Sequence, residues 1–376
     1  MSSGGRYLKN TPKKSNRKWV VTLAVILIVA LLISLVAGFV ISKMNKIRRA
    51  EKGENSLTAE DLQGMIVEDP EPTTEATTVP TTEATEPVET KPNYGKTGKV
   101  VNVLLIGQDA RPGEDSKNSD TLILCTVNKE TKKLTLTSFL RDSFVYIPPF
   151  KDSYGQTHDG RTKMTLCYAL GYKWGGDLGA MELMDMVIER NFGSVVDHNI
   201  EINLDAFDAF INAIGGIYVE LDADETKYLN DKFKDVEDYV FEEGENKLDG
   251  WAAEEYARMR HSTAADNDFK RTNRQRIVVS KVLERIKTMS LTQINALIDE
   301  MLPMFLTDMS NSDITTYVME LLPILPELTI ESQECPSAEI RGGKVVDLFG
   351  DGVPQSIITF NEADAKAIMT AITECD

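Results

Sequence analysis

The chain has 376 residues, 42% of them hydrophobic, which is enough for one large domain or two ordinary ones. Its formal net charge of −18 is unevenly distributed: the first 53 residues carry 11 Lys/Arg against one acid, and the remainder carries 30 against 58. So acidic a C-terminal part would repel nucleic-acid phosphates, which excludes nucleic acid as the expected partner. The four cysteines include no CxxC pair and the three histidines are scattered, so no zinc site is expected.

The basic N-terminal segment contains an apolar run that begins at Trp19 and ends at Ile41. Its 23 residues are enough to cross a bilayer with some tilt. The run is too long for the apolar region of a signal peptide, and no small-x-small cleavage site follows at once. We therefore expect a basic cytoplasmic tail over residues 1–18 and an uncleaved, single-pass transmembrane helix over residues 19–41, rather than a buried core helix.

Residues 42–97 are expected to form a linker, because TTEATTVPTTEATEPVET is low-complexity sequence that cannot bury enough apolar surface to fold. Such a sequence is either an extended, self-repelling stalk or plain disordered chain without a spacer role. Six Lys/Arg before the apolar run and five after it discriminate little between the two membrane orientations. The acidity of the remainder and the linker composition favour an extracytoplasmic C-terminal part at the cell membrane.

The folded part is expected to begin at residue 98 with near-continuous apolar strands, which are typical of a sheet covered on both faces. Strands are predicted at 99–107, 121–127, 134–138, 200–203, 217–221, 344–348 and 356–359. Helices are predicted at 181–192, 204–214, 248–260, 271–287, 291–305, 314–322 and 362–373, and a polar loop at 152–161. This alternation predicts an α/β fold, an α-β-α sandwich with a mixed central sheet. The core would span residues 98–290, with residues 291–376 as a helical and strand extension of the same domain.

Three short polar clusters lie where the first three strands begin or end. Asp109-Ala-Arg111 follows the first strand, Ser119-Asp120-Thr121 opens the second, and Arg141-Asp142 follows the third. Ligand sites of open α/β sheets gather outside the carboxyl ends of strands, so Asp109 and Asp120 are expected to converge. Two carboxylates without cysteine or clustered histidine favour a hard cation such as Mg²⁺, which also binds substrate phosphates. Taken singly, each cluster is equally well explained by loop caps and turns.

A dense arginine cluster occupies residues 258–276, RMRHSTAADNDFKRTNRQR. Guanidinium groups bind phosphate or carboxylate in a bidentate manner. On a helix that starts near Asp268, the residues Arg271, Arg274, Gln275 and Val278 form one stripe that leans toward the interior. Alone, the cluster is better explained by internal ion pairs or a solvated charge run. Beside a magnesium-binding carboxylate pair, it predicts phosphoryl transfer.

The order of these motifs resembles the LytR-CpsA-Psr family. The segments that carry the resemblance are LLIGQDAR, SDTLIL, SFLRD, KMTLCYALG, AIGGIYVEL and LDGWAAEEYARMRHSTAADNDFKRTNRQR, of which DFKRTNRQR is the most specific. The resemblance implies a membrane-tethered, extracytoplasmic phosphotransferase that uses Mg²⁺. It would move an anionic glycopolymer, such as a teichoic acid or a capsular polysaccharide, from a polyprenyl-pyrophosphate carrier to peptidoglycan. The lipid tail would lie in an apolar cavity, and the pyrophosphate would meet the arginines.

The resemblance also implies residue roles. Asp109 and Asp120 match the magnesium carboxylates. The pyrophosphate-binding positions are Arg111, Arg141, Arg258, Arg260, Arg271 and Gln275, the catalytic positions are Arg141, Asp142, Arg271 and Arg274, and Asp268 is a supporting residue that orients an arginine. The general base is left open, with Asp142 as one candidate. Leu140 and Thr165 stand where the family often has proline and asparagine, which affects local loop shape.

Two alternative functions stay open. A polyprenyl-pyrophosphate phosphatase or pyrophosphatase would use the same site with water as the acceptor. A non-catalytic, lipid-carrier-binding regulator of envelope genes would not need both Asp109 and Asp120. The stripe from Arg271 to Val282 further predicts an apolar cavity beside Arg271 that would hold the lipid tail. Cys335 and Cys375 are a candidate disulfide pair in an oxidising compartment.

Overall fold

The computed structural model describes residues 47–58, 61–62, 65–67, 98–108, 117–259, 266–321 and 323–373. These residues belong to one compact unit that begins at Ile47. The predicted basic tail and the apolar run at 19–41 lie outside the described residues, as does Cys375. Within the described part of the chain, no helix combines the length and the apolar character needed to cross a membrane.

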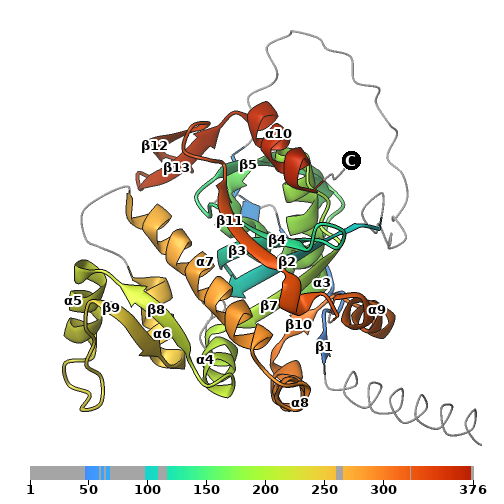
Figure 1. The fold of residues 1–376 in the computed structure, drawn as a ribbon. Coiled ribbons are helices and arrows are strands. Elements are labelled where there is room, and N and C mark those ends of the chain that lie inside the picture. Colours follow the sequence, from blue (N-terminus) through green and yellow to red (C-terminus); the bar gives the residue numbers. More distant parts are fainter. Residues whose placement is uncertain are drawn as a thin grey trace, which may run out of the picture. The chain divides into compact units, whose positions relative to one another are not determined.

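A mixed seven-stranded sheet runs through the middle of the unit, as the sequence predicts (Figure 1). In spatial order its strands are β1 (Arg48–Arg49), β10 (Leu306–Thr307), β7 (His198–Asn203), β2 (Val100–Gln108), β3 (Ser119–Asn128), β4 (Lys133–Phe139) and β11 (Thr329–Cys335). Strands β2, β3 and β4 are antiparallel neighbours, whereas β7 pairs with β2 and β11 pairs with β4 in parallel. Alternate side chains of β2 and β3 are buried on opposite faces, which explains their near-continuous apolar sequences.

One face of the sheet is covered by the long helix α3 (Met164–Phe192) and by α10 (Glu362–Thr373). Leu104 and Ile106 of β2 pack on this side with Met181, Leu183 and Met184 of α3. Helix α3 is kinked at Gly175 and Gly176, and Gly176 has a φ of 67°. A side chain at Gly176 would meet the backbone nitrogen of Gly53 at 2.6 Å. The kink therefore lets another part of the chain approach the helix backbone directly.

The opposite face of the sheet is covered by α7 (Asp266–Lys287), with α4 (Leu204–Ala213) and α6 (Gly250–Arg258) beside it (Figure 1). Val279 and Leu283 of α7 pack on this face against Ile123 and Leu136 of the sheet. A separate apolar cluster joins α4, α6 and α7 to α5 (Ala223–Lys232) and to the hairpin of β8 (Ile217–Leu221) and β9 (Gly244–Leu248).

The remaining elements surround these layers. They are the hairpin of β5 (Phe144–Lys151) and β6 (Thr157–Lys163), helices α8 (Leu291–Met301) and α9 (Asn311–Leu321), the hairpin of β12 (Arg341–Asp347) and β13 (Pro354–Phe360), and 3₁₀ turns at Leu302–Met304 and Leu325–Glu327. The predicted loop at 152–161 is therefore wrong in its second half, because THDGRTK forms β6 without apolar alternation. The predicted helix at 181–192 is only the second part of α3, since the two glycines at the kink conceal its first part.

The first described residues, 47–58, 61–62 and 65–67, pack against the unit, and we call them the N-terminal strap. Strand β1 pairs in parallel with β10 at one edge of the sheet. Further along, the Gly53 N–H donates to the Gly175 carbonyl at 2.7 Å, and the Ser153 N–H donates to the Leu57 carbonyl at 2.8 Å. Val67 and Arg161 exchange two backbone hydrogen bonds. Leu57 is fully buried in the core beneath α3. The strap is therefore an integral part of the folded unit.

The predicted linker over 42–97 differs from the structure at this point. The Thr/Pro/Glu-rich sequence lies between Val67 and Gly98, and both ends belong to the same unit. It therefore connects two parts of one unit and does not separate residue 41 from the domain. The strap is held by backbone hydrogen bonds and by isolated buried residues such as Leu57 and Leu62, which leave no periodic pattern in the sequence.

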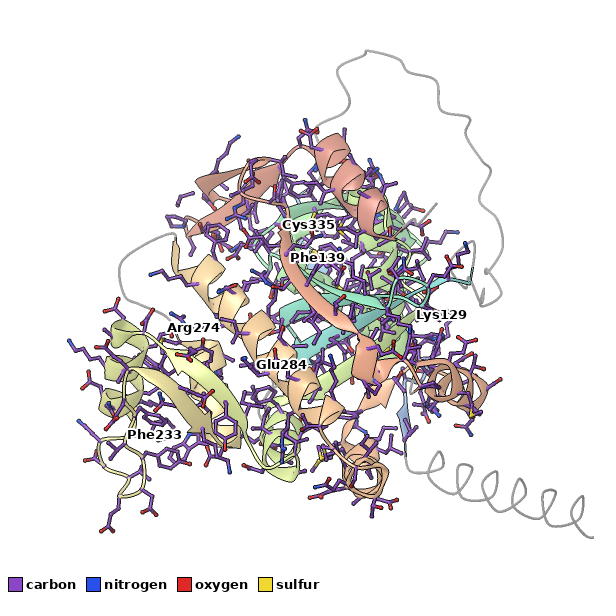
Figure 2. The ribbon with its side chains drawn as sticks, viewed as in Figure 1. Lys129, Phe139, Phe233, Arg274, Glu284 and Cys335 are labelled. Atoms are coloured by element: carbon purple, nitrogen blue, oxygen red, sulfur yellow. The ribbon has the colours of Figure 1, made fainter. Side chains whose placement is uncertain are left out.

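Arg274 of α7 links this helix to α5 and to the end of α6 (Figure 2). Its Nε donates to Oε1 of Glu225 at 2.7 Å, and its Nη1 donates to the carbonyl of Met259 at 3.2 Å. Glu225 also completes the capping box of α5 with Asp222. One buried guanidinium therefore joins the start of α5, the end of α6 and the middle of α7.

We predict that Leu57→Ala lowers the free energy of unfolding by about 2–5 kcal/mol, because it removes a fully buried side chain from the core. Urea unfolding measures the change. Val353→Ala, at a position that is 55% exposed, is the control and should stay within about 0.5 kcal/mol of the original chain. Equal stability of the Leu57 variant and the original chain would show that the strap is not part of the core.

We also predict that Arg274→Ala lowers the free energy of unfolding by about 3–5 kcal/mol, since it leaves Glu225 buried without its cation. The double variant Arg274→Met with Glu225→Gln should regain much of that loss. Lys281→Ala removes an exposed ion pair of the same helix and should cost less than about 1 kcal/mol. An Arg274→Ala protein that unfolds like the original would contradict this structural role.

Candidate active site

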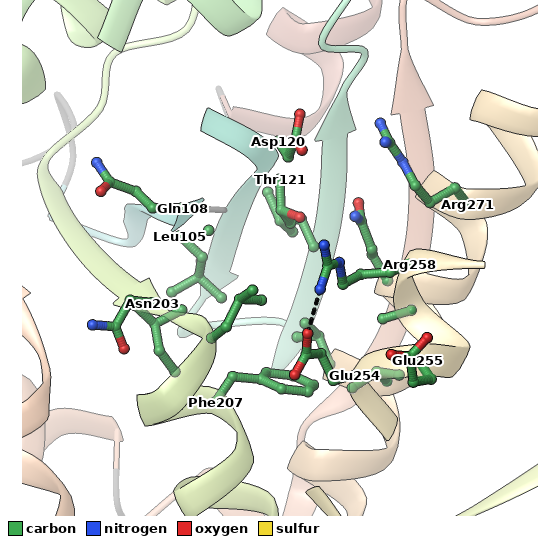
Figure 3. Close-up of a pocket in the computed structure, with 18 of the residues that line it drawn as sticks. Leu105, Gln108, Asp120, Thr121, Asn203, Phe207, Glu254, Glu255, Arg258 and Arg271 are labelled. Atoms are coloured by element: carbon green, nitrogen blue, oxygen red, sulfur yellow. Dashed lines mark hydrogen bonds and ion pairs between the residues drawn. The ribbon is translucent and has the colours of Figure 1, made fainter. Parts of the chain in front are cut away.

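A cavity of about 480 Å³ lies between the sheet and the helices α4, α6 and α7 (Figure 3). Its polar end is formed by Gln108, Asp120, Thr121, Arg271 and Gln275, and its apolar lining includes Leu105, Ile123, Phe207, Val278 and Val279. An apolar cavity beside Arg271 is what the stripe on α7 predicts, and this prediction is confirmed. Glu254, Glu255 and Lys232 also line the cavity, so charged and apolar side chains share one volume and the charges are not confined to the polar end.

Helical and strand periodicity explain why these side chains meet. Arg271, Gln275 and Val278 are spaced by four and three residues on α7, so they lie on one side of the helix. Thr121 and Ile123 are spaced by two residues on β3, so they point to the same face of the sheet. Arg271 is only 3% exposed, so its guanidinium faces the interior of the unit.

The Arg141-Asp142 pair lies at the end of β4, next to the polar end of the cavity. Arg141 Nη1 donates to Asp120 Oδ1 at 2.6 Å, which joins two of the predicted site residues. Asp142 Oδ1 accepts from Lys163 Nζ at 3.1 Å, and Asp142 Oδ2 lies 3.7 Å from Arg141 Nε. The backbone carbonyl of Arg141 accepts from the N–H of Thr165 in the first turn of α3. The turn is therefore fixed by both its side chains and its backbone.

Arg258 lines the cavity from the last turn of α6, where Nη1 donates to Glu254 Oε1 at 2.5 Å (Figure 3). The structure thus brings together Asp120, Arg141, Arg258, Arg271 and Gln275, with Asp142 adjacent. Asp109, Arg111 and Arg260 lie outside the described residues, as does the side chain of Asp268.

Arg274 does not line the cavity that Arg271 of the same helix lines. Its guanidinium is occupied by Glu225 of α5 and by the Met259 carbonyl. Arg276 is also buried, 4.0 Å from Glu334, and burial lowers the pKa of Arg276. These two arginines stabilise the fold around α7, as the internal ion-pair explanation of the cluster requires. The ion pair with Glu225 gives Arg274 a structural role, and the catalytic role predicted for it stays a prediction.

Four titratable residues of the cavity lining were not predicted from the sequence: Tyr228, Lys232, Glu254 and Glu255. Lys232 of α5 forms a 3.0 Å ion pair with Glu255 of α6. Burial and the neighbouring Glu255 raise the pKa of Tyr228. The spacing of Glu254 and Arg258, four residues apart on one helix, is the signal that could have indicated the Glu254 contact.

The described residues at the polar end of the cavity could bind a hard cation only together with a bound substrate. Within the described part of the chain, no group of three or more histidine, cysteine, aspartate or glutamate residues could hold a metal by itself. Asp120 supplies one carboxylate at the polar end. Mg²⁺ commonly binds through one or two carboxylates together with substrate phosphates, so this donor set fits Mg²⁺ held jointly by protein and substrate.

Comparisons with known proteins agree with this architecture. Among curated relatives, Biofilm regulatory protein A of Streptococcus mutans is 33% identical over 192 residues, which are 50% of this chain and 44% of that protein. The polyisoprenyl-teichoic acid–peptidoglycan teichoic acid transferase TagU of Oceanobacillus iheyensis is 32% identical over 200 residues, which are 53% of this chain and 56% of that protein. The chain spans about half the length of the curated relatives it matches.

Among solved structures, TagT bound to LIIa-WTA is similar with a TM-score of 0.54 and 25% identity, covering 76% of this chain and 92% of that chain. The α/β fold with a mixed central sheet is therefore shared with a known structure. The LytR_cpsA_psr family model matches residues 71–352, which is most of the chain. This chain belongs to the LytR_cpsA_psr family.

Proposed function

We propose that this chain is a phosphotransferase that moves an anionic glycopolymer from a polyprenyl-pyrophosphate carrier to peptidoglycan. The observation that carries the proposal is a cavity whose wall combines guanidinium and carboxylate groups with apolar side chains. A lipid diphosphate likewise combines a charged head with a hydrocarbon tail. The name of the similar TagU, a teichoic acid transferase, and the TagT structure with LIIa-WTA support the same class of substrate.

The polar residues have distinct tasks in this reaction. Arg258 and Arg271 line the cavity where they neutralise the diphosphate, and Arg141 reaches it beside Asp120. An acceptor hydroxyl oxygen bonds to the phosphorus that carries the glycopolymer. The bond from that phosphorus to the bridging oxygen breaks, and polyprenyl phosphate leaves with the electron pair. The hydroxyl proton passes to a base. Asp142 has a cation beside each carboxylate oxygen, which suits it better to orienting Arg141 than to acting as that base.

Magnesium is part of the proposal. Asp120 and, in the sequence, Asp109 would hold Mg²⁺ together with the diphosphate. When bound, the ion would neutralise negative charge on the diphosphate oxygens during transfer. Arg141 would then exchange Asp120 for a phosphate oxygen, because a charge-assisted hydrogen bond of similar strength replaces the one that is lost.

The proposal also includes attachment to the cell membrane through residues 19–41, with the folded unit on the extracytoplasmic side. The length and apolar character of that run support a single-pass anchor. The strap begins at Ile47, so only a few residues separate the end of the run from the first described residue of the folded unit. This short connection suits an enzyme whose substrate is a membrane lipid.

We predict that Asp120→Asn and Arg271→Ala each reduce transfer by at least about 100-fold, the scale seen when one group that stabilises a developing charge is removed. The full chain in detergent micelles would be incubated with a polyprenyl-pyrophosphate-linked glycan and a peptidoglycan oligomer, and the ligated product would be quantified. Lys281→Ala, on the exposed side of the same helix as Arg271, should retain full activity.

Three results of this assay separate the candidate functions. Ligated product supports the transferase. Release of phosphate or of free glycan without ligation would favour a phosphatase or pyrophosphatase. Tight binding of the lipid-linked glycan without either product would favour a regulator, a possibility kept open by the similarity to Biofilm regulatory protein A. Full activity of either site variant would contradict the assigned residues.

We further predict that chelation by EDTA abolishes transfer and that added Mg²⁺ restores it. In the same titration, Asp120→Asn should require a higher Mg²⁺ concentration for half-maximal binding of the lipid-linked glycan, because one oxygen ligand has lost its charge. This binding is read by tryptophan fluorescence, independently of turnover. Binding and transfer that are both unaffected by EDTA would remove magnesium from the proposal.

A further inference from the structure

The hairpin of β12 and β13 contacts two segments that carry predicted site arginines. The Ile358 N–H of β13 donates to the backbone carbonyl of Asp142, in the turn that follows β4, at 2.8 Å. The guanidinium carbon of Arg341, on β12, lies 3.7 Å from the centroid of the Phe269 ring, at the start of α7. Figure 1 shows the hairpin beside this end of the helix. One hairpin therefore connects the turn after β4 to the helix that carries Arg271.

Arg341 is held in place from two sides. Its Nη1 donates to Glu334 Oε1, on β11, at 2.5 Å and to the Pro336 carbonyl at 3.0 Å. Its guanidinium lies over Phe269, and its side chain is only 12% exposed, so this cation–π contact is largely desolvated. Such contacts are stronger where water is excluded. Arg341 therefore forms a firm link between the C-terminal strands and α7.

Glu334 extends this link to a second point on α7. Its Oε2 lies 4.0 Å from Arg276 Nη2, and the Arg276 side chain is 8% exposed. Phe269 and Arg276 are seven residues apart, which is close to two helical turns, so they lie on the same side of α7. Arg271 follows Phe269 by two residues and lines the cavity on another side of the helix. The helix is therefore held on one side while it presents Arg271 on another.

Arg271 lies near the start of α7, which begins at Asp266. The first backbone N–H groups of a helix have no partner within the helix, so the start of a helix depends on contacts from outside. We propose that Arg341 is a positioning residue that, through Phe269, holds Arg271 where it meets the diphosphate. Arg341 itself does not line the cavity. The inference rests on the proposed function for the identity of the ligand, a lipid diphosphate.

Loss of the Arg341 contact should reduce the affinity for the diphosphate without changing the lining of the cavity. When the start of α7 leaves its binding-competent position for part of the time, the apparent affinity falls in proportion to the competent fraction. A desolvated cation–π contact and a charge-assisted hydrogen bond are together large enough to change the affinity by about tenfold. Because the effect passes through Arg271, it should be much smaller in a protein that already lacks that guanidinium.

The test uses the full chain in detergent micelles and calorimetric titration with farnesyl pyrophosphate, with probe concentrations raised for weakly binding variants. Arg341→Ala, Arg271→Ala and the double variant form a cycle that separates an effect through Arg271 from an independent one. Phe269→Leu removes the aromatic face and leaves the ion pair between Arg341 and Glu334 in place, so it replaces Arg341→Ala in the cycle if that variant does not fold. Lys344→Ala, at an exposed position of β12, is the matched control.

We expect Arg341→Ala to weaken probe binding by about tenfold and Phe269→Leu by several-fold, while Lys344→Ala binds like the original chain. The double variant should bind within about twofold of Arg271→Ala. Original affinity in the Phe269→Leu protein and in a folded Arg341→Ala protein would overturn the inference and leave the proposed function standing. A loss that recurs in full in the Arg271→Ala protein would do the same, because Arg341 would then act independently of Arg271. Failure of the original chain to bind the probe would overturn both.

Discussion

Helix α7 packs across one face of the central sheet through Val279 and Leu283, and this contact fixes where its arginines point. Residues on one side of the helix, Arg271 and Gln275, face the cavity. Arg274 points toward α5 and α6, where Glu225 receives it, and Arg276 lies near Glu334 of β11. One helix therefore supplies both a binding wall and two buried cations that stabilise the fold. If α7 were rotated about its axis, different arginines would face the cavity. The contact between α7 and the sheet therefore determines which arginine lines the site.

The sequence could predict what depends on periodicity. The apolar strands, the mixed sheet and the row of Arg271, Gln275 and Val278 follow from spacings of two, three and four residues. The sequence could not distinguish Arg271 from Arg274, because both lie within one helical stripe and only the neighbouring Glu225 decides between them. Glu225 belongs to α5, whose polar sequence ADETKYLNDK indicated no buried face. A long-range partner, and not a local pattern, separates a structural arginine from one that lines the cavity.

The N-terminal strap is a second feature that local sequence patterns could not predict. Composition correctly identifies a stretch that lacks apolar residues, but composition cannot place its boundaries where packing is mainly through the backbone. The contact between Gly53 and the kink at Gly176 requires two glycines far apart in the chain, and neither is informative alone. Because the strap already packs on α3, folded structure precedes the Thr/Pro/Glu-rich sequence, whereas composition places the start of the fold after that sequence.

Each cation at the cavity for which a partner is described is already paired with a carboxylate. Arg141 contacts Asp120, Arg258 contacts Glu254, and Lys232 contacts Glu255. Under the proposed function, an entering diphosphate must therefore exchange partners with these carboxylates, and each displaced carboxylate needs a new source of positive charge. Under the proposed function Mg²⁺ would serve Asp120. An acidic unit would thus bind an anion without a large excess of arginine, because the cation compensates a carboxylate that the ligand displaces.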